Sequence, residues 1–202
     1  MPSPLDEHSA PHQPWDLFRD WYEAARPLHP PEPDAMALAT VGADGRPSAR
    51  IVLLKQFDDT GLVFHTHYDS RKGEDLAHHP VAALLFYWPA QLRQVRIEGS
   101  VSRLESEASD AYFKTRPRDS QIGAWASPQS RPLQGRTELD SRLDRYTARF
   151  AGQAIPRPPH WGGYRLLPLR FEFWQARANR LHDRLLYQRR ADQTWSLERL
   201  AP

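Results

Sequence analysis

A short C-terminal stretch combines residue types that can hold a flat, electron-rich, anionic ligand. Trp174 is followed by Arg180, His182 and Arg184. The two arginines supply permanently charged donors, the histidine exchanges a proton near neutral pH, and the tryptophan offers a stacking face. The alternative is an ordinary charged hairpin in which Asp183 pairs with an arginine, an arrangement that contributes little to stability. Spacing alone leaves both interpretations open.

A second set of basic residues falls at the ends of predicted elements. Arg50 and Lys55 bracket an apolar run, and Arg71 and Lys72 follow Ser70 at a predicted helix start. A helix N-terminus has free N–H groups and a positive dipole end, so these side chains suit a phosphate site. Arg50 and Lys55 are an odd number of residues apart, so a regular strand directs them to opposite faces unless Lys55 lies beyond its end. The alternative is a solvated turn.

A third group contains Tyr112, Arg116 and Ser120, with Arg118 between the last two. Tyr112 and Arg116 are four residues apart, so they share one face of a helix. Together with Ser120 they could clamp a phosphate, or they could simply close a helix end. Gln129 and Ser130, in a polar loop, could likewise donate to a phosphate or form a turn.

Other chemistries find less support. The pairs His65/His67 and His78/His79 lack an acidic third ligand at useful spacing, so we expect no metal. The chain has no cysteine and no Gly-x-Ser-x-Gly turn, which leaves no marked nucleophile. Glycine-rich nucleotide loops of the Rossmann or P-loop type are also missing.

Composition limits the class of protein. The 202 residues are 40% hydrophobic and 11% aromatic, enough for one domain with a sizeable core. No apolar run reaches the roughly 20 residues of a membrane span, and a net charge of +2 does not favour nucleic acid. The start of the chain does not resemble a secretory signal. With no cysteine, the chain suits the reducing cytosol, so we expect a cytoplasmic protein.

The order of β-rich and helical segments predicts an α+β domain. Expected strands are 36–41, 48–55, 62–66, 81–88, 94–104, 164–174, 185–188 and 195–200. Expected helices are 15–26, 70–79, 106–115, 120–126 and 137–150. The first three strands are expected to form an antiparallel meander, and the whole a barrel-like antiparallel sheet with inserted helices. Because prolines crowd the start of the chain, we divide it into a Pro-rich arm with one helix, 1–34, and a main domain, 35–202.

These segments occur in an order that resembles the pyridoxamine 5'-phosphate oxidase family over nearly the whole chain. The matching blocks are 35–36, 50–55, 70–72, 93–95, 116–125, 161–163, 172–175, 180–184 and 199–202. The resemblance implies an FMN-binding split β-barrel, Greek-key-like and homodimeric, with FMN in clefts at the subunit interface. It also implies that 160–202 serves substrate binding and dimerisation.

The resemblance assigns site residues position by position. FMN would contact Arg50, Ile51, Val52, Leu53, Leu54, Lys55, His65, Thr66, Arg71, Lys72, Gln129 and Ser130, and its ring would lie near Gln94, Trp174 and Arg184. The substrate phosphate would be held by Lys55, Tyr112, Arg116 and Ser120. Arg180, Leu181 and His182 would lie over the substrate ring, with Arg180 and His182 as the catalytic residues.

The implied activity is oxidation of pyridoxamine and pyridoxine 5'-phosphates by O2 to pyridoxal 5'-phosphate, with H2O2 and, from the amine, NH3. The sequence departs from the family in three places, the slightest of which is Glu32-Pro33, where some members have Asp-Pro. The segment before the first helix has neither Arg nor Tyr, whereas many members carry a basic lid there, and His65 and His67 replace aromatic and Asn residues. Two alternatives are a related FMN oxidase of phenazine formation and a non-catalytic module that binds flavin or pyridoxal phosphate.

Overall fold

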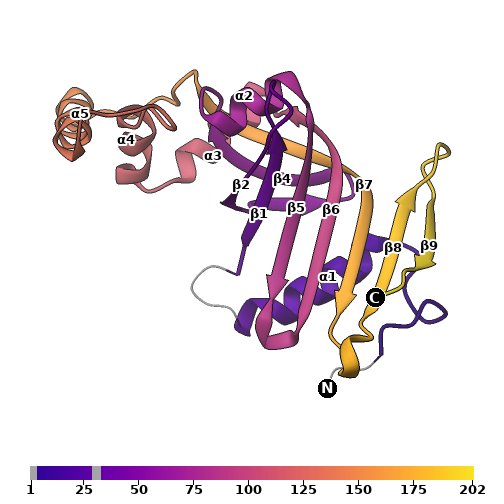
Figure 1. Cartoon of the computed structure of the whole chain (residues 1–202). Coiled ribbons are helices and arrows are strands. Elements are labelled where there is room, and N and C mark those ends of the chain that lie inside the picture. Colours follow the sequence, from indigo (N-terminus) through magenta and orange to yellow (C-terminus); the bar gives the residue numbers. More distant parts are fainter. Residues whose placement is uncertain (1–3, 29–32) are drawn as a thin grey trace.

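The computed structural model describes residues 4–28 and 33–202. Residues 1–3 and 29–32, part of the expected Pro-rich arm, lie outside the described residues. The helices in Figure 1 are α1 Pro14–Ala25, α2 Arg71–His78, α3 Ser106–Thr115, α4 Arg118–Ala126 and α5 Arg136–Arg149, with 3-10 turns η1 Arg26–Leu28, η2 Pro89–Gln91 and η3 Ala178–Arg180. The strands are β1 Ala35–Val41, β2 Pro47–Leu53, β3 Gln56–Asp58, β4 Gly61–His67, β5 Val81–Trp88, β6 Arg93–Arg103, β7 Trp161–Gln175, β8 Asp183–Arg189 and β9 Trp195–Arg199.

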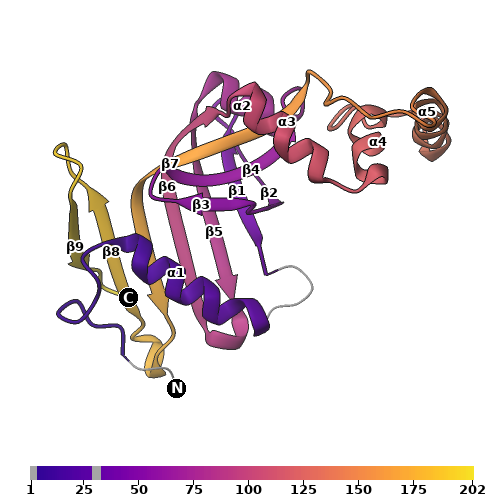
Figure 2. The ribbon, with the colours of Figure 1, turned by 180° about the vertical axis from the view of Figure 1, so that it is seen from behind.

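All the strands of the described residues belong to one antiparallel sheet. Its order is β2-β1-β5-β6-β7-β4-β3, with β8 added to β7 and β9 to β8. Strand β7 is the longest, and it pairs with β4 near its start and with β8 near its end. Figures 1 and 2 show the sheet curling, with β7 running from the end beside α2 and α3 to the end beside the N-terminus.

The first three expected strands do not form a meander, so that prediction is wrong. β1 pairs with β2, but β4 pairs with β7, where Leu62 lies opposite Leu166. A short strand that the sequence did not reveal, β3, pairs with β4 in a hairpin. Strand β4 is buried along almost its whole length, which fits an interior position beside the distant β7. Local sequence patterns carry no information on such a non-local pairing.

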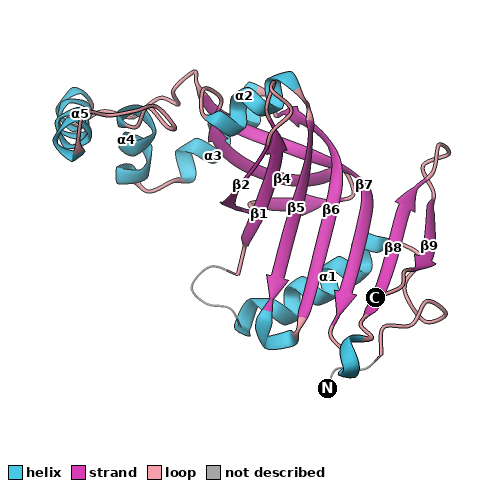
Figure 3. Ribbon diagram, in the orientation of Figure 1, coloured by secondary structure: helices cyan, strands magenta, loops and turns pink. Residues whose placement is uncertain are grey.

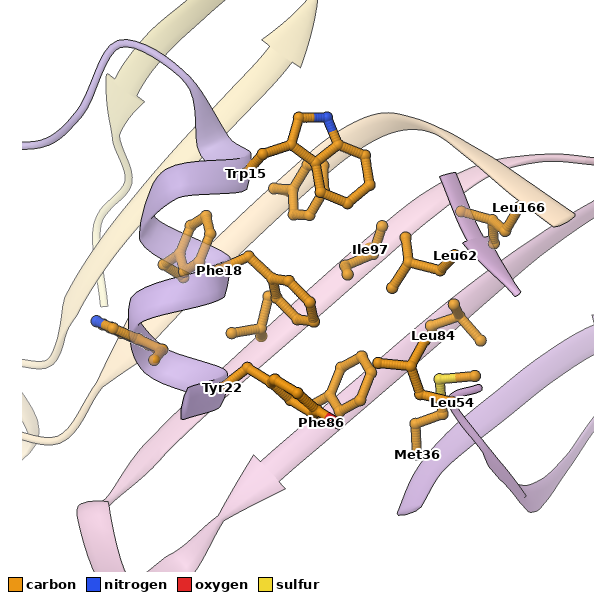
Figure 4. Packing of buried hydrophobic residues seen from close by; sticks show 14 of the residues in the cluster. Trp15, Phe18, Tyr22, Met36, Leu54, Leu62, Leu84, Phe86, Ile97 and Leu166 are labelled. Carbon is orange, nitrogen blue, oxygen red and sulfur yellow. The ribbon is translucent and has the colours of Figure 1, made fainter. Parts of the chain in front are cut away.

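Helix α1 covers one face of the sheet and forms the main core (Figure 2). Pro14 lies in its first turn, and Trp15, Phe18, Trp21 and Tyr22 form a buried aromatic stripe. Ring centroids of Trp15 and Phe171 are 4.9 Å apart, and those of Phe18 and Phe86 are 5.3 Å apart. Figure 4 shows this packing. The stripe therefore packs against the sheet rather than holding a ligand.

Helices α3, α4 and α5 extend from one end of the sheet (Figure 3) and have a small core of their own. Pro117 is the N-cap of α4, so the helix begins at Arg118, two residues before the predicted start. The apolar face of α5 is only partly covered, with Leu143 41% exposed. No helix among the described residues has the length and apolar character to cross a membrane.

Two element boundaries bear on the site. Strand β2 ends at Leu53, so Lys55 lies beyond the strand end. The expectation that a regular strand directs Arg50 and Lys55 to opposite faces therefore does not apply. Ser70 is the N-cap residue of α2, but its hydroxyl makes no capping hydrogen bond. Instead, Ser70 Oγ donates to the His67 carbonyl at 2.7 Å, which fixes the turn that leads into α2.

Candidate active site

A cleft of about 830 Å³ lies between β2, β4, the start of α2, and α3 with α4. It gathers most of the residues that the sequence placed in the FMN and substrate-phosphate groups. These are Arg50, Ile51, Val52, Leu53, Lys55, His65, Thr66, Arg71, Lys72, Tyr112, Arg116, Ser120, Gln129 and Ser130. Leu54, in the same run, does not line the cleft, because its side chain is 2% exposed and packs in the main core. Any role of Leu54 in binding would therefore rest on its backbone.

Lys72 forms the base of one end of the cleft. Its Nζ donates to Thr66 Oγ1 at 3.0 Å, to Ser70 Oγ at 3.2 Å and to Gln129 Oε1 at 2.8 Å. These three acceptors are neutral, so they hold the ammonium group without cancelling its charge. Burial, followed by the nearby Arg50, lowers the pKa of Lys72 to about 8. The side chain thus presents a buried cation, which suits an anionic ligand.

Arg116 is a second cation in the same cleft, and Tyr112 lines the cleft with it. The guanidinium carbon of Arg116 lies 4.6 Å from the ring centroid of Trp161, a cation–π arrangement. Among the described residues, Nη1 of Arg116 is one of the few buried side-chain atoms without a hydrogen-bond partner. A buried donor without a partner is costly, and an anionic ligand would satisfy it. Arg118 faces elsewhere and donates to the carbonyls of Phe150 and Gln153.

Two histidines line the cleft, His67 buried and His65 half-buried. The ring of His65 stacks on Tyr112 at 3.9 Å and on Trp161 at 5.3 Å, and that of His67 stacks on His160 at 5.3 Å. Burial, with Arg116 and Lys55 nearby, lowers the pKa of His65 to about 4. Burial, with His160 nearby, lowers the pKa of His67 to about 4 as well. Both imidazoles are therefore neutral at physiological pH.

These lowered pKa values predict a loss of stability in acid. Between about pH 6.5 and pH 4 these two histidines bind protons in the unfolded chain but not in the folded protein. The free energy of unfolding therefore falls as the pH falls. After discounting for solvent screening, we expect on the order of 1 kcal/mol for each histidine and a melting temperature lower by about 4–8 °C at the acid end of this range. The measurement is thermal unfolding across this range at constant protein concentration. His65→Phe with His67→Phe should flatten the dependence, whereas the exposed control His79→Asn should not. An unchanged slope in the double variant would contradict this assignment.

The remaining predicted residues lie together at the far end of β7. Gln94 lies opposite Trp174 in the sheet, and Trp174 lies opposite Arg184. The ring of His182 is 4.6 Å from that of Trp174. Arg184 pairs with the buried Glu172 at 2.8 Å. The structure thus confirms that this stretch forms a cluster of indole, imidazole and guanidinium groups.

The charged-hairpin interpretation is also correct in part. Asp183 pairs with Arg177 at 2.7 Å and with Arg199 at 3.1 Å, so Asp183 is a structural residue. Arg180, by contrast, is exposed at the end of η3 with a positive φ of 60°, and Leu181 is 67% exposed. Arg180 and Leu181 therefore face outward.

One chain does not bring the two sets of residues together. Trp161 lines the cleft and Trp174 belongs to the distal cluster, and both lie on β7. At about 3.3 Å per residue, the path between them along the strand is roughly 40 Å. Figure 1 shows α3 beside the start of β7, whereas the short orange turn of η3 follows the other end of this strand. A site that uses both sets needs a second copy of the chain.

Comparison with known proteins agrees with this arrangement. The sequence profile described as pyridoxamine 5'-phosphate oxidase matches residues 23–159, and that of the pyridoxine 5'-phosphate oxidase C-terminal dimerisation region matches residues 161–202. The chain belongs to the pyridoxamine 5'-phosphate oxidase family. Among its relatives are the pyridoxine/pyridoxamine 5'-phosphate oxidases of Burkholderia lata, 55% identical over 98% of this chain and 93% of the relative, and of Bordetella petrii, 54% identical over 99% and 94%.

Solved structures of this family share the fold. Crystalline PhzG from Burkholderia lata, in complex with tetrahydrophenazine-1-carboxylic acid, superposes with a TM-score of 0.90 at 36% identity and 98% coverage of both chains. A pyridoxamine 5'-phosphate oxidase-related, FMN binding protein from Nostoc punctiforme gives a TM-score of 0.74 at 22% identity, over 94% of this chain and 98% of that one. The predicted split β-barrel of the oxidase family is thus confirmed, and the family's C-terminal segment is a dimerisation region.

The cleft also contains residues that the sequence did not single out. Trp161 lies beneath Arg116, and Ser48 lines the cleft beside Arg50. The spacing of Ser48 and Arg50 carried a signal, because strand residues two apart share a face. Asp75, whose buried carboxylate accepts from Ser48 Oγ, carried no comparable signal.

Proposed function

We propose that this chain is an FMN-dependent oxidase that converts pyridoxamine 5'-phosphate and pyridoxine 5'-phosphate to pyridoxal 5'-phosphate. Oxygen would be consumed, with H2O2 formed and NH3 released from the amine, in cytoplasmic synthesis or salvage of vitamin B6. The observation that carries the proposal is the presence of two separate cationic groups in one cleft. A phosphorylated cofactor and a phosphorylated substrate together require two such groups.

The residues at the Lys72 end fit FMN. Lys72 with Arg50 and Arg71 would hold the phosphate, since two of these cations surround the start of α2 and the third points from β2. Gln129 already accepts from Lys72 and lies within the cleft, so its amide can also reach the ligand. Bound FMN would accept a hydride equivalent from the substrate and pass the electrons to O2.

The residues at the Arg116 end suit the substrate. Arg116, with its unpartnered Nη1, would receive the phosphate together with Lys55, Tyr112 and Ser120. Anchoring the phosphate would fix the position of the substrate ring and lower the entropic part of the barrier. The neutral His65 stacks on Tyr112 and so holds the phenol in place.

The distal cluster would complete the site from a second copy of the chain. Support comes from the family's dimerisation region and from apolar side chains left open on the sheet, including Ile51 at 64% and Tyr87 at 57% exposed. Nδ1 of His182 accepts the backbone N–H of Arg177, so a neutral ring carries its proton on Nε2. Arg180 would orient the substrate while His182 holds or moves a proton beside it.

The proposal predicts that Arg116→Ala selectively impairs phosphorylated substrates. We expect kcat/KM for pyridoxine 5'-phosphate to fall by about 100-fold, because a charge-assisted contact to the phosphate is lost. The kcat/KM for unphosphorylated pyridoxine should not change. Arg118→Ala is the matched control, since Arg118 faces away from the cleft. An equal loss on both substrates would contradict the assigned clamp.

A second candidate is oxidation of a reduced phenazine acid. The observation in its favour is the similarity to PhzG, a structure that holds tetrahydrophenazine-1-carboxylic acid. Such a ligand has a carboxylate but no phosphate, so it gives the Arg116 group less to bind. Parallel assays with both substrate classes would decide, and activity confined to the phenazine acid would overturn the first proposal.

A further inference from the structure

A buried carboxylate lies behind the cationic wall of the cleft. Asp75, on α2, is 6% exposed, and neither the family resemblance nor the fold assigns it a role. Its Oδ2 accepts from Thr40 Oγ1 at 2.6 Å and from Ser48 Oγ at 3.1 Å. By itself, a negative charge behind a phosphate site would weaken phosphate binding. The position of Asp75 therefore calls for another role.

The same two hydroxyls are acceptors for Arg50. Nη1 of Arg50 donates to Thr40 Oγ1 at 2.7 Å and to the Leu38 carbonyl at 3.2 Å, and Nη2 donates to Ser48 Oγ. Nη2 of Arg50 also lies 3.7 Å from Asp75 Oδ2. Three groups from β1, β2 and α2 therefore meet around one guanidinium.

The protons of the two hydroxyls fix which groups donate and which accept in this hydrogen-bond network. Each hydroxyl has a single proton, and in both cases Asp75 accepts it. Only lone pairs then remain to face Arg50, so the two hydroxyls must act as acceptors toward the guanidinium. Without the carboxylate, either hydroxyl could rotate its proton toward Arg50 and displace it. The nearby Arg50 and Lys72 would also repel each other without compensation.

We propose that Asp75 is a positioning residue for the phosphate end of the flavin site, acting through Thr40 and Ser48 to hold the Arg50 guanidinium in the cleft. This inference rests on the proposed binding of FMN. The alternative is that Asp75 only stabilises the packing of α2 on β1 and β2. The two roles differ in one respect, because positioning of Arg50 affects a ligand's phosphate and not its flavin ring.

The test compares FMN with riboflavin, which lacks the phosphate. Dissociation constants of both are measured by flavin fluorescence quenching on the full-length apoprotein, for the unaltered chain, Asp75→Ala, Asp75→Asn, Arg50→Ala and the Asp75→Ala/Arg50→Ala double variant. We expect Asp75→Ala to weaken FMN by about tenfold and riboflavin not at all. Asp75→Asn keeps an oxygen that accepts both hydroxyls, so its loss should be about threefold or less. In the Arg50→Ala background, Asp75→Ala should have no further effect.

Two results would overturn the inference. Equal losses for FMN and riboflavin would assign Asp75 to the fold alone, and a tenfold loss that persists without Arg50 would show that Asp75 does not act through Arg50. If Asp75→Ala unfolds, Asp75→Asn replaces it in the comparison of the two flavins. An unchanged ratio of the FMN and riboflavin dissociation constants in Arg50→Ala would also remove the premise. Failure of the unaltered protein to bind either flavin would instead refute the proposed function, and with it this inference.

Discussion

Two nearly inactive variants, Arg116→Ala and Arg180→Ala, should regain about a quarter of the unaltered activity when their subunits are mixed into the same dimers. Arg116 lies in the cleft and Arg180 lies beyond the opposite end of β7. If each active site takes its cleft from one copy and its distal cluster from the other, a mixed dimer has one intact site. Random mixing makes about half of the dimers mixed, and each of these has half of its sites intact.

Subunit exchange by mild denaturation and renaturation, followed by the oxidase assay, measures this recovery. The matched control mixes Arg116→Ala with Lys72→Met, because both changes lie in the cleft and every mixed site keeps one of them. That mixture should stay inactive. Recovery in the control, or none in the test mixture despite proven exchange, would contradict a site shared between two copies.

Lys72→Met should release the flavin, with FMN affinity lowered by about 100-fold. The methionine has a similar length and can occupy the buried position, but it cannot donate to Thr66, Gln129 or a phosphate. Lys114→Met is the matched control, because Lys114 is exposed on α3 and lies outside the cleft. The measurement is the dissociation constant of FMN, together with the flavin retained after gel filtration.

The pH dependence of FMN affinity gives the same prediction a second readout. Burial lowers the pKa of Lys72 to about 8, so its positive charge is lost as the pH rises through that value. FMN affinity should therefore fall at alkaline pH in the unaltered protein, and Lys72→Met should remove that part of the dependence. Full flavin retention by Lys72→Met would show that the phosphate lies elsewhere.

Elements bounded by strong local signals were predicted well from the sequence. Pro14 and Pro27 bracket α1, whose observed end is one residue from the predicted one, and Asp58 to Gly61 correctly mark the turn into β4. The basic groups at Arg71-Lys72 and at Tyr112-Arg116 line one cleft. These predictions succeeded because helix starts, turns and i, i+4 pairs depend on neighbours in the sequence.

What the sequence did not reveal depends on contacts between distant segments. The pairing of β4 with β7 joins residues far apart in the chain, and the inward orientation of Leu54 follows from where the sheet folds over the core. The network of Thr40, Ser48 and Asp75 combines two strands and a helix. The separation of Arg180 and His182 from the cleft likewise depends on the full length of β7, which no local sequence pattern reveals.

The most direct test of the central claim is the visible spectrum of the purified protein during an anaerobic addition of pyridoxine 5'-phosphate. The account predicts that the flavin absorbance bleaches, and that air restores it with formation of H2O2 and pyridoxal 5'-phosphate. A flavin band that persists with saturating pyridoxine 5'-phosphate and pyridoxamine 5'-phosphate would contradict oxidation of these substrates. Bleaching by a reduced phenazine acid in the same sample would then identify the other branch of the family as the correct one.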